Sequence, residues 1–211
     1  MTDPLFIEIE KFDTWAQTQF DTPQDDIGGE WECDFKEWDK IYSAFDNFLI
    51  QTDANRWTEK EMGRLLYIIA RDNESGHLSD LLNESALIVL TKYAITHGKR
   101  DAKWQLAVQL YKLSDSQLAT TFLNEFVNDK EEYVNRRALM ELAKLKSEKV
   151  ETYAELFWNR NIYGDMDEYQ KMAVLYSLKE INSKQLDKYI QLAKQDGRQY
   201  LVQNAIKIES E

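Results

Sequence analysis

The last half of the chain repeats one short helical signature, an aromatic residue followed three to five residues later by an alanine. The alanines of successive copies, Ala107, Ala138, Ala173 and Ala205, are 31, 35 and 32 residues apart. A period of this length is typical of stacked helical hairpins, each of which covers the apolar face of its neighbour. We expect the alanine to let the neighbouring helix approach closely and the aromatic to fill the space between hairpins. On this interpretation the signature is structural and contributes no site residue. The aromatics are Trp104, Tyr133, Tyr169 and Tyr200.

Turn-forming residues are rare, which favours long helices joined by short connections. Only seven glycines and two prolines occur among 211 residues. Asp3 before Pro4 predicts the first helix start, Thr58 with Glu61 predicts a capping box, and Gly98 predicts a helix end. Further capping boxes are predicted at 114–117, 129–132 and 165–168. The predicted helices are about 4–19, 35–51, 58–71, 84–97, 100–112, 115–128, 130–145, 148–159, 166–181, 184–194 and 197–207, with a short piece near 78–82.

Negative charge is concentrated at the start of the chain. The net charge is −12, and residues 1–34 hold ten acids and one base. Residues 20–34 contain Pro23, Gly28 and Gly29 and show no helical period, which predicts a loop. A field of this sign repels phosphate backbones and anionic lipid surfaces and would attract a basic protein. The simpler interpretation is a solvated surface that keeps the chain in solution.

The run from Tyr133 to Ala143 resembles the second helix of HEAT-type repeats, in which a hydrophobe, an arginine, an alanine and a leucine follow a turn acid. Arg136 or Arg137 would match the arginine that bonds to the turn of a neighbouring repeat, and the other copies lack it. The resemblance covers roughly residues 57–208. It implies an all-α, right-handed α-solenoid of about five to six antiparallel helical hairpins. We expect a single domain, 1–211, with residues 1–34 as an acidic N-terminal helix and loop and residues 35–211 as the hairpin array.

No motif predicts catalysis or a cofactor. His77 and His97 are twenty residues apart without a third ligand nearby, so structural or surface roles are expected. Cys33 lacks the basic surroundings that activate a thiol. The acids at 165–168 fit a helix cap better than a metal site. We therefore expect a protein that is not an enzyme and has no cofactor and no metal.

The sequence also predicts the cellular compartment of the protein. No signal peptide and no run of eighteen apolar residues is visible, and a single cysteine excludes an internal disulfide. We expect a cytoplasmic protein without a membrane partner. The sequence leaves its oligomeric state open.

Nucleic-acid binding is the main alternative from a different class, because one group of HEAT-like proteins consists of DNA glycosylases for alkylated bases. Trp57, Trp104 and Trp158 would then be base-stacking platforms. The basic residues are interleaved with acids, however, and the net charge opposes a phosphate backbone. We therefore expect these tryptophans in the core and no nucleic-acid partner.

The function we predict is non-catalytic protein binding. In size, acidity and helical-repeat build the chain is similar to some immunity proteins of bacterial polymorphic toxin systems, which implies a basic cognate toxin as partner. Carboxylates would steer that partner and Trp31 would be an aromatic anchor. The alternative is a generic scaffold or regulatory module. A polar patch at 71–74 either closes a helix end or forms a partner-contacting ridge. The predicted contacts are Asp25, Asp26, Glu30, Trp31, Glu32, Asp72 and Glu74.

Overall fold

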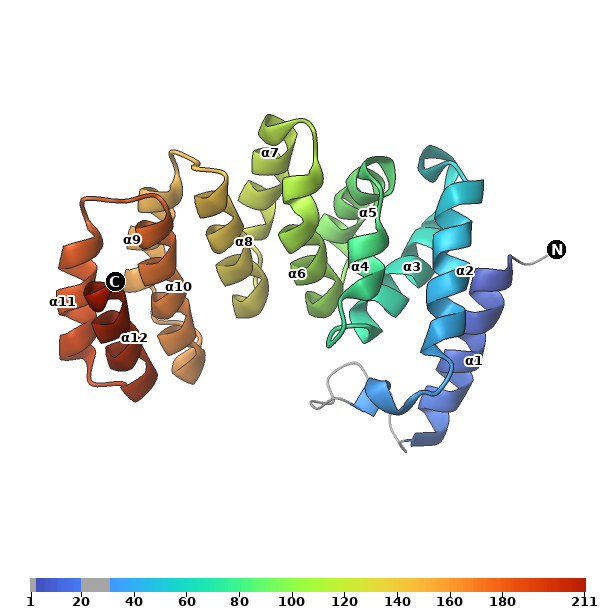
Figure 1. The fold of residues 1–211 in the computed structure, drawn as a ribbon, viewed down its shortest axis with the longest axis horizontal. Helices are drawn as coiled ribbons and strands as arrows, with labels where there is room; N and C mark the ends of the chain where they lie inside the picture. The colour runs from blue at the N-terminus through green and yellow to red at the C-terminus, as the bar shows by residue number, and fades with distance from the viewer. Residues whose placement is uncertain (1–2, 20–30) are drawn as a thin grey trace. The chain divides into compact units, whose positions relative to one another are not determined.

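The computed structural model describes residues 3–19 and 31–211, and these are all-helical, as predicted. Twelve α-helices and four short 3-10 turns occur in the described ranges, without any strand. None of these helices is long and apolar enough to cross a membrane. The chain divides into two compact units, Met1–Gln109 and Leu110–Glu211 (Figure 1). The single continuous domain stays a prediction.

Unit 1 is built from six α-helices that pack both along the chain and across it. The first helix contacts the second and third, the third contacts the fifth and sixth, and the short fourth helix contacts the second and the sixth. The third and sixth helices are tied together where Gln105 Nε2 donates to the backbone carbonyl of Ile69 at 2.6 Å. The elements are α1 (Pro4–Gln19), η1 (Trp31–Asp34), α2 (Trp38–Gln51), η2 (Ala54–Arg56), α3 (Glu59–Arg71), α4 (His77–Leu81), α5 (Glu84–His97) and α6 (Arg100–Gln109).

Aromatic side chains make up much of the core of unit 1. The Phe12 ring lies 5.1 Å from both Phe35 and Trp38, and the Phe48 ring stacks on Trp57 at 5.4 Å. The Phe12–Phe35 contact is edge-on, an arrangement that aromatic rings prefer. The indole nitrogen of Trp57 donates to Thr52 Oγ1 at 2.9 Å, which satisfies its polar atom inside the core.

Unit 2 consists of three consecutive antiparallel pairs, α7 with α8, α9 with α10, and α11 with α12. The second helices of successive pairs are also in contact. The α10 helix packs against both α8 and α12. The elements are η3 (Leu110–Lys112), α7 (Ser116–Phe126), α8 (Glu132–Lys144), α9 (Val150–Asn159), η4 (Gly164–Met166), α10 (Asp167–Glu180), α11 (Leu186–Asp196) and α12 (Gln199–Ser210).

The repeated signature separates into a buried part and a surface part. The alanines are buried as expected, but the aromatics do not fill the core: Tyr133 and Tyr169 are partly exposed, and Tyr200 keeps 54% of its surface. For Tyr133 and Tyr200, helix geometry explains why the aromatic side chain reaches the surface although the alanine is buried. Successive residues turn by about 100°, so a residue five positions before an alanine lies about 140° around the helix from it.

Several predicted helix starts are confirmed. Asp3 Oδ1 accepts from the backbone N–H of Leu5 at 2.9 Å, with Pro4 as the first residue of α1. Thr58 and Glu61 form the reciprocal capping box of α3. Gly98 caps α5 at its C-terminus, where a Cβ atom would lie 2.8 Å from the carbonyl oxygen of Ala94.

Other predicted starts are wrong. Asp115, rather than Ser114, caps α7. Asp129 accepts from the N–H of Glu131 at 2.9 Å and so closes the turn before α8 instead of capping that helix. Asp167 is already the first residue of α10 and accepts from the N–H of Tyr163 at 3.1 Å. The α2 helix begins at Trp38 rather than Phe35, because residues 31–34 form the η1 turn. Short polar side chains serve turns and caps alike, so spacing alone does not separate the two.

Candidate functional site beside the acidic segment

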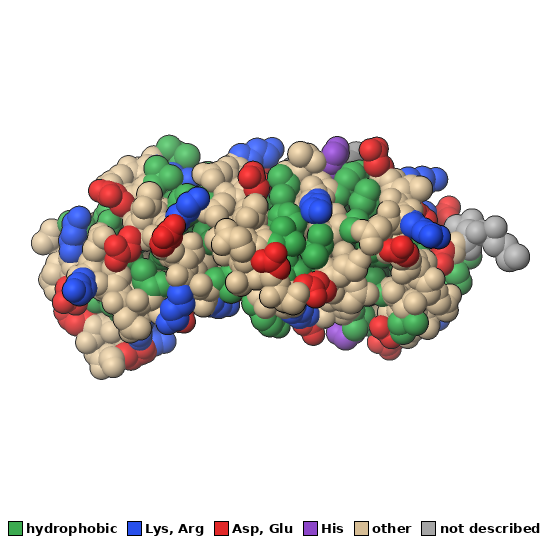
Figure 2. Space-filling view, turned by 90° about the horizontal axis from the view of Figure 1, so that it is seen from above, with side chains coloured by type: hydrophobic (Ala, Val, Ile, Leu, Met, Phe, Trp, Pro, Cys, Tyr) green, Lys and Arg blue, Asp and Glu red, His purple; other side chains and the backbone are tan. Residues whose placement is uncertain are grey.

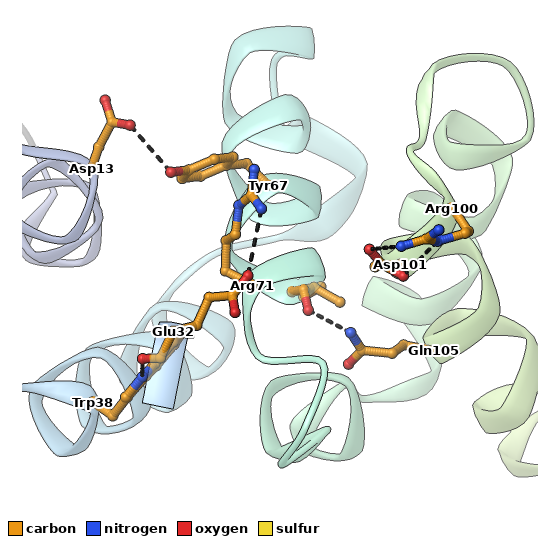
Figure 3. Close-up of polar contacts among 9 residues, drawn as sticks. Asp13, Glu32, Trp38, Tyr67, Arg71, Arg100, Asp101 and Gln105 are labelled. Atoms are coloured by element: carbon orange, nitrogen blue, oxygen red, sulfur yellow. Dashed lines mark hydrogen bonds and ion pairs between the residues drawn. The ribbon is translucent and has the colours of Figure 1, made fainter. Parts of the chain in front are cut away.

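Five side chains from four elements of unit 1 are linked by contacts into one cluster. In the sequence they come from both sides of residues 20–30, which lie outside the described residues. We call Asp13 of α1, Glu32 of η1, Trp38 of α2, and Tyr67 and Arg71 of α3 the anchor cluster (Figure 3). The stretch 20–30 that it flanks contains four acids and no base. The anchor cluster therefore fixes the chain before and after the most acidic part of the sequence.

Arg71 is the central cation of the anchor cluster. It is the last residue of α3, where a positive charge complements the helix dipole. Its Nη1 lies 3.5 Å from Glu32 Oε1, and the two side chains are only 11% and 5% exposed. The guanidinium carbon also lies 5.4 Å from the centre of the Tyr67 ring, in cation–π range. A buried ion pair thus holds η1 against the end of α3.

Two further hydrogen bonds complete the anchor cluster. The Tyr67 hydroxyl donates to Asp13 Oδ1 at 3.1 Å, which ties α3 to α1. The indole nitrogen of Trp38 donates to the backbone carbonyl of Glu32 at 2.8 Å, which ties α2 to η1. Both flanks of the 20–30 stretch are therefore bonded to the body of unit 1.

Burial dominates the electrostatics of Glu32. Loss of solvent raises the pKa of its carboxyl, and the nearby charge of Asp101 raises it further, whereas a backbone hydrogen bond and Arg71 oppose the rise. Glu32 Oε2 is buried, and no described residue offers it a hydrogen bond. Such a carboxylate depends strongly on its cation. Its chemistry is that of a structural ion pair.

Asp72 closes the turn between α3 and α4. Its Oδ1 accepts from the Tyr42 hydroxyl at 2.9 Å, and its Oδ2 accepts from the backbone N–H of Leu78 at 2.7 Å. Burial raises the pKa of the Asp72 carboxyl despite these bonds. The structure thus favours the simpler of the two sequence interpretations for this residue, the closing of a helix end.

The structure changes the set of predicted partner contacts. Glu32 and Asp72 are only 4% and 3% exposed and bond within the fold, so neither carboxylate is available at the surface and both leave the contact set. Glu74 is exposed, and its contact role stays a prediction. Trp31 begins η1, but its side chain lies outside what the structure describes. The other three predicted contacts, Asp25, Asp26 and Glu30, also lie outside the described residues.

The sequence-based prediction places Arg71 in the polar patch at 71–74 but misses its ion pair with Glu32, and it misses Tyr67 altogether. Tyr67 and Arg71 are four residues apart in one predicted helix, a spacing that places two side chains side by side. That pairing was a usable signal. The partners Asp13 and Glu32 are 54 and 39 residues away from them in the sequence, and no local pattern marks such a distance.

The cysteine and the two histidines belong to no metal site in the described part of the chain. There, no group of three or more His, Cys, Asp or Glu side chains is placed to hold a metal ion. Cys33 is exposed. His77 and His97 are exposed, and each packs against a tyrosine ring, that of Tyr42 and Tyr93 respectively.

The tryptophans considered as base-stacking platforms are mostly core residues. Trp57 and Trp158 are buried, as expected, and Trp158 packs edge-on against Tyr189 at 4.9 Å. Trp104 alone among the three is partly exposed. Figure 2 shows Lys and Arg side chains interspersed with Asp and Glu on one face of the molecule. That face carries no continuous basic patch of the kind that nucleic acid requires.

The Tyr67 hydroxyl gives a pH prediction for the anchor cluster. Burial, with the charge of Asp13, raises the pKa of Tyr67 to about 12 from its ordinary value of 10.0. Its contribution to stability is therefore complete below pH 10 and is lost as the pH rises through 12. Tyr67→Phe should be less stable than the parent at pH 8, and the difference should shrink between pH 10 and 12. Chemical denaturation across this range measures it, and a difference that stays constant to pH 12 contradicts it.

Comparison with protein-family models, with curated proteins and with solved structures gives no match to this chain.

Proposed function

We propose that the chain is a non-catalytic protein-binding module, and specifically an immunity protein that binds and neutralises a basic toxin. The observation that supports this proposal is the buried Arg71–Glu32 pair, which fixes one flank of the acidic 20–30 stretch to α3. The Tyr67–Asp13 bond fixes α1, which precedes the stretch, to the same helix. Asp21, Asp25, Asp26 and Glu30 lie between the two flanks in the sequence.

Fixed flanks make these acids a better recognition element than a free acidic tail. The four acids lie within ten consecutive residues of the sequence, so their charges add in the field that a cationic partner meets. Grouped carboxylates speed the encounter with a cationic protein, and this acceleration falls steeply as salt increases. Glu32 supports this element from inside the fold, and Asp25, Asp26 and Glu30 are its proposed contacts.

The proposed architecture is a right-handed, HEAT-like α-solenoid with residues 1–34 as its acidic cap. The buried alanines at the recurring positions support it, as do the side-by-side contacts of α8, α10 and α12 within unit 2. The departure from the HEAT pattern lies in Arg136, which bonds to Glu132 one turn earlier in its own helix.

The test expresses the chain together with the product of the gene immediately upstream of its own. If that product is a toxin, co-expression should restore growth, and the two proteins should elute as one complex. The Asp25→Lys/Asp26→Lys/Glu30→Lys variant should slow association by about tenfold or more at low salt. The matched control is Asp46→Lys/Glu125→Lys/Glu155→Lys, which reverses three exposed acids outside the acidic cap.

The outcomes separate the candidate functions. Equal association rates for the two triple variants would remove the acidic stretch from the proposal. A neighbouring product that binds without being toxic would favour the scaffold or regulatory function. Failure to restore growth against a toxic neighbour rejects the immunity function.

A further inference from the structure

Three signature tyrosines of unit 2 form a continuous row with one arginine. We call Tyr133, Arg136, Tyr169 and Tyr200 the stacked row. The Arg136 guanidinium carbon lies 4.4 Å from the centre of the Tyr133 ring and 5.4 Å from that of Tyr169. The Tyr169 and Tyr200 rings are stacked, with 6.4 Å between their centres. The row thus runs across α8, α10 and α12, and all four side chains reach the surface.

The guanidinium of Arg136 is held from one edge only. Its Nε donates to Glu132 Oε2 at 2.9 Å, and no described residue accepts a hydrogen bond from its two Nη nitrogens. The Arg136 side chain is 19% exposed, so it is largely desolvated while its outer edge still meets solvent. A guanidinium fixed between two rings is pre-organised to pair with a carboxylate through two parallel hydrogen bonds.

A buried amide network stiffens the base of the row. Asn135 Nδ2 donates to the Tyr163 hydroxyl at 2.9 Å, and Gln170 Nε2 donates to Asn135 Oδ1 at 2.8 Å. Asn135 and Gln170 are fully buried neighbours of Arg136 and Tyr169 in sequence. They bond α8 directly to α10, which holds the row's spacing. A rigid aromatic surface loses little conformational entropy on binding, which is characteristic of interface hot spots.

Arg136 carries the one charge among the four side chains that define the stacked row. Glu132 is buried beneath Arg136, and burial raises the pKa of its carboxyl despite that partner. Glu168, beside Tyr169 in sequence, accepts from the backbone N–H of Leu201 at 2.9 Å. The Glu132 carboxylate is enclosed in the fold, whereas no described residue accepts a hydrogen bond from the Nη nitrogens of Arg136. A cationic ligand would be repelled there, so an anionic one fits better.

We propose that the stacked row binds an acidic segment of a partner protein. A carboxylate of that segment pairs with the Nη nitrogens of Arg136, and an adjacent apolar side chain lies on the Tyr169 and Tyr200 rings. A nucleic-acid strand fits less well, because it carries a phosphate at every nucleotide, the row offers one arginine, and the chain has a net charge of −12. This surface lies in unit 2 and would bind an anionic partner, whereas the acidic stretch would bind a cationic one. The proposal for the stacked row therefore does not depend on the immunity proposal.

The test measures fluorescence anisotropy of three labelled probes with the full chain at low salt. The probes are a twelve-residue peptide of alternating glutamate and proline, its lysine–proline counterpart, and a twelve-nucleotide oligothymidylate. The acidic peptide should bind, and the other two should bind at least tenfold more weakly. Arg136→Gln should weaken acidic-peptide binding by about tenfold, and Arg136→Lys should restore only part of it, because lysine lacks the planar fork.

Two more variants separate binding from folding. Tyr200→Ala changes an exposed ring that does not contact Glu132, and it should also weaken binding several-fold with an unchanged melting temperature. Tyr111→Ala, which removes an exposed tyrosine of η3 outside the row, should bind like the parent. The proposal is overturned if the acidic peptide does not bind, if Arg136→Gln and Tyr200→Ala both bind like the parent, or if the oligothymidylate binds more tightly than the acidic peptide.

Discussion

Arg71→Met is expected to lower the free energy of unfolding by about 3–5 kcal/mol at pH 7, because it leaves a buried carboxylate without its cation. Glu32 is the carboxylate concerned, and the ion pair joins atoms 3.5 Å apart with both side chains about nine-tenths buried. The same change removes the cation from the face of Tyr67. Urea denaturation followed by circular dichroism measures the loss.

The pH dependence of this loss identifies its cause. The pKa of Glu32 is already raised by burial, and removing Arg71 should raise it further. Because the pKa of Glu32 is higher in the folded protein than its ordinary value of 4.5, protonation of Glu32 stabilises the folded protein at low pH. This contribution to stability is complete below pH 4.5 and is lost as the pH rises through the folded-state pKa. The cost of Arg71→Met should therefore be smaller at pH 4 than at pH 7. A cost that is independent of pH would assign it to lost packing instead.

Two controls sharpen the Arg71 experiment. Adding Glu32→Gln to Arg71→Met should recover part of the lost stability at pH 7, because the unpaired charge is then gone. Arg56→Met breaks a 3.7 Å pair with Asp53 in which both side chains are largely exposed, and it should change stability little. An Arg71 variant that behaves like Arg56→Met would show that the ion pair does not anchor η1.

The helical secondary structure is largely predictable because its information is local. Helix period, Asp3 before Pro4, and the Thr58–Glu61 box all act within a few residues, and the structure places helix starts at both sites. The signature alanines are buried because small residues are needed where helices approach. The prediction for Tyr133 and Tyr200 is wrong because it treats a five-residue spacing as one helix face, although that spacing spans about 140° of rotation.

The candidate site was predictable only in its charge. The sequence shows ten acids in residues 1–34, but it does not distinguish Glu32, which is buried, from its neighbours. That difference depends on Arg71, which reaches Glu32 only after α3 has packed beside η1. Ion pairing across 39 residues is a property of tertiary packing, and a single sequence carries no local signal for it.

Asn135→Ala is expected to destabilise the protein by about 2–4 kcal/mol, which is more than one average hydrogen bond, because several buried polar groups lose their partner together. The Asn135 side chain is fully buried and bonds to the backbone carbonyl of Asp129, to the Tyr163 hydroxyl and to Gln170. Thermal and urea denaturation measure the change.

Coupling within this network can be separated from the loss of a single contact. Gln170 also accepts from Arg160 Nε at 2.8 Å, so Asn135 and Gln170 belong to one chain of bonds from α8 to the end of α9. The Asn135→Ala/Gln170→Ala double variant should therefore cost clearly less than the sum of the single variants. Asn128→Ala, which removes an exposed amide bonded to Asn124, should have little effect. Strict additivity would mean that the amides act independently, and the rigidity inferred for the base of the stacked row would then lose its support.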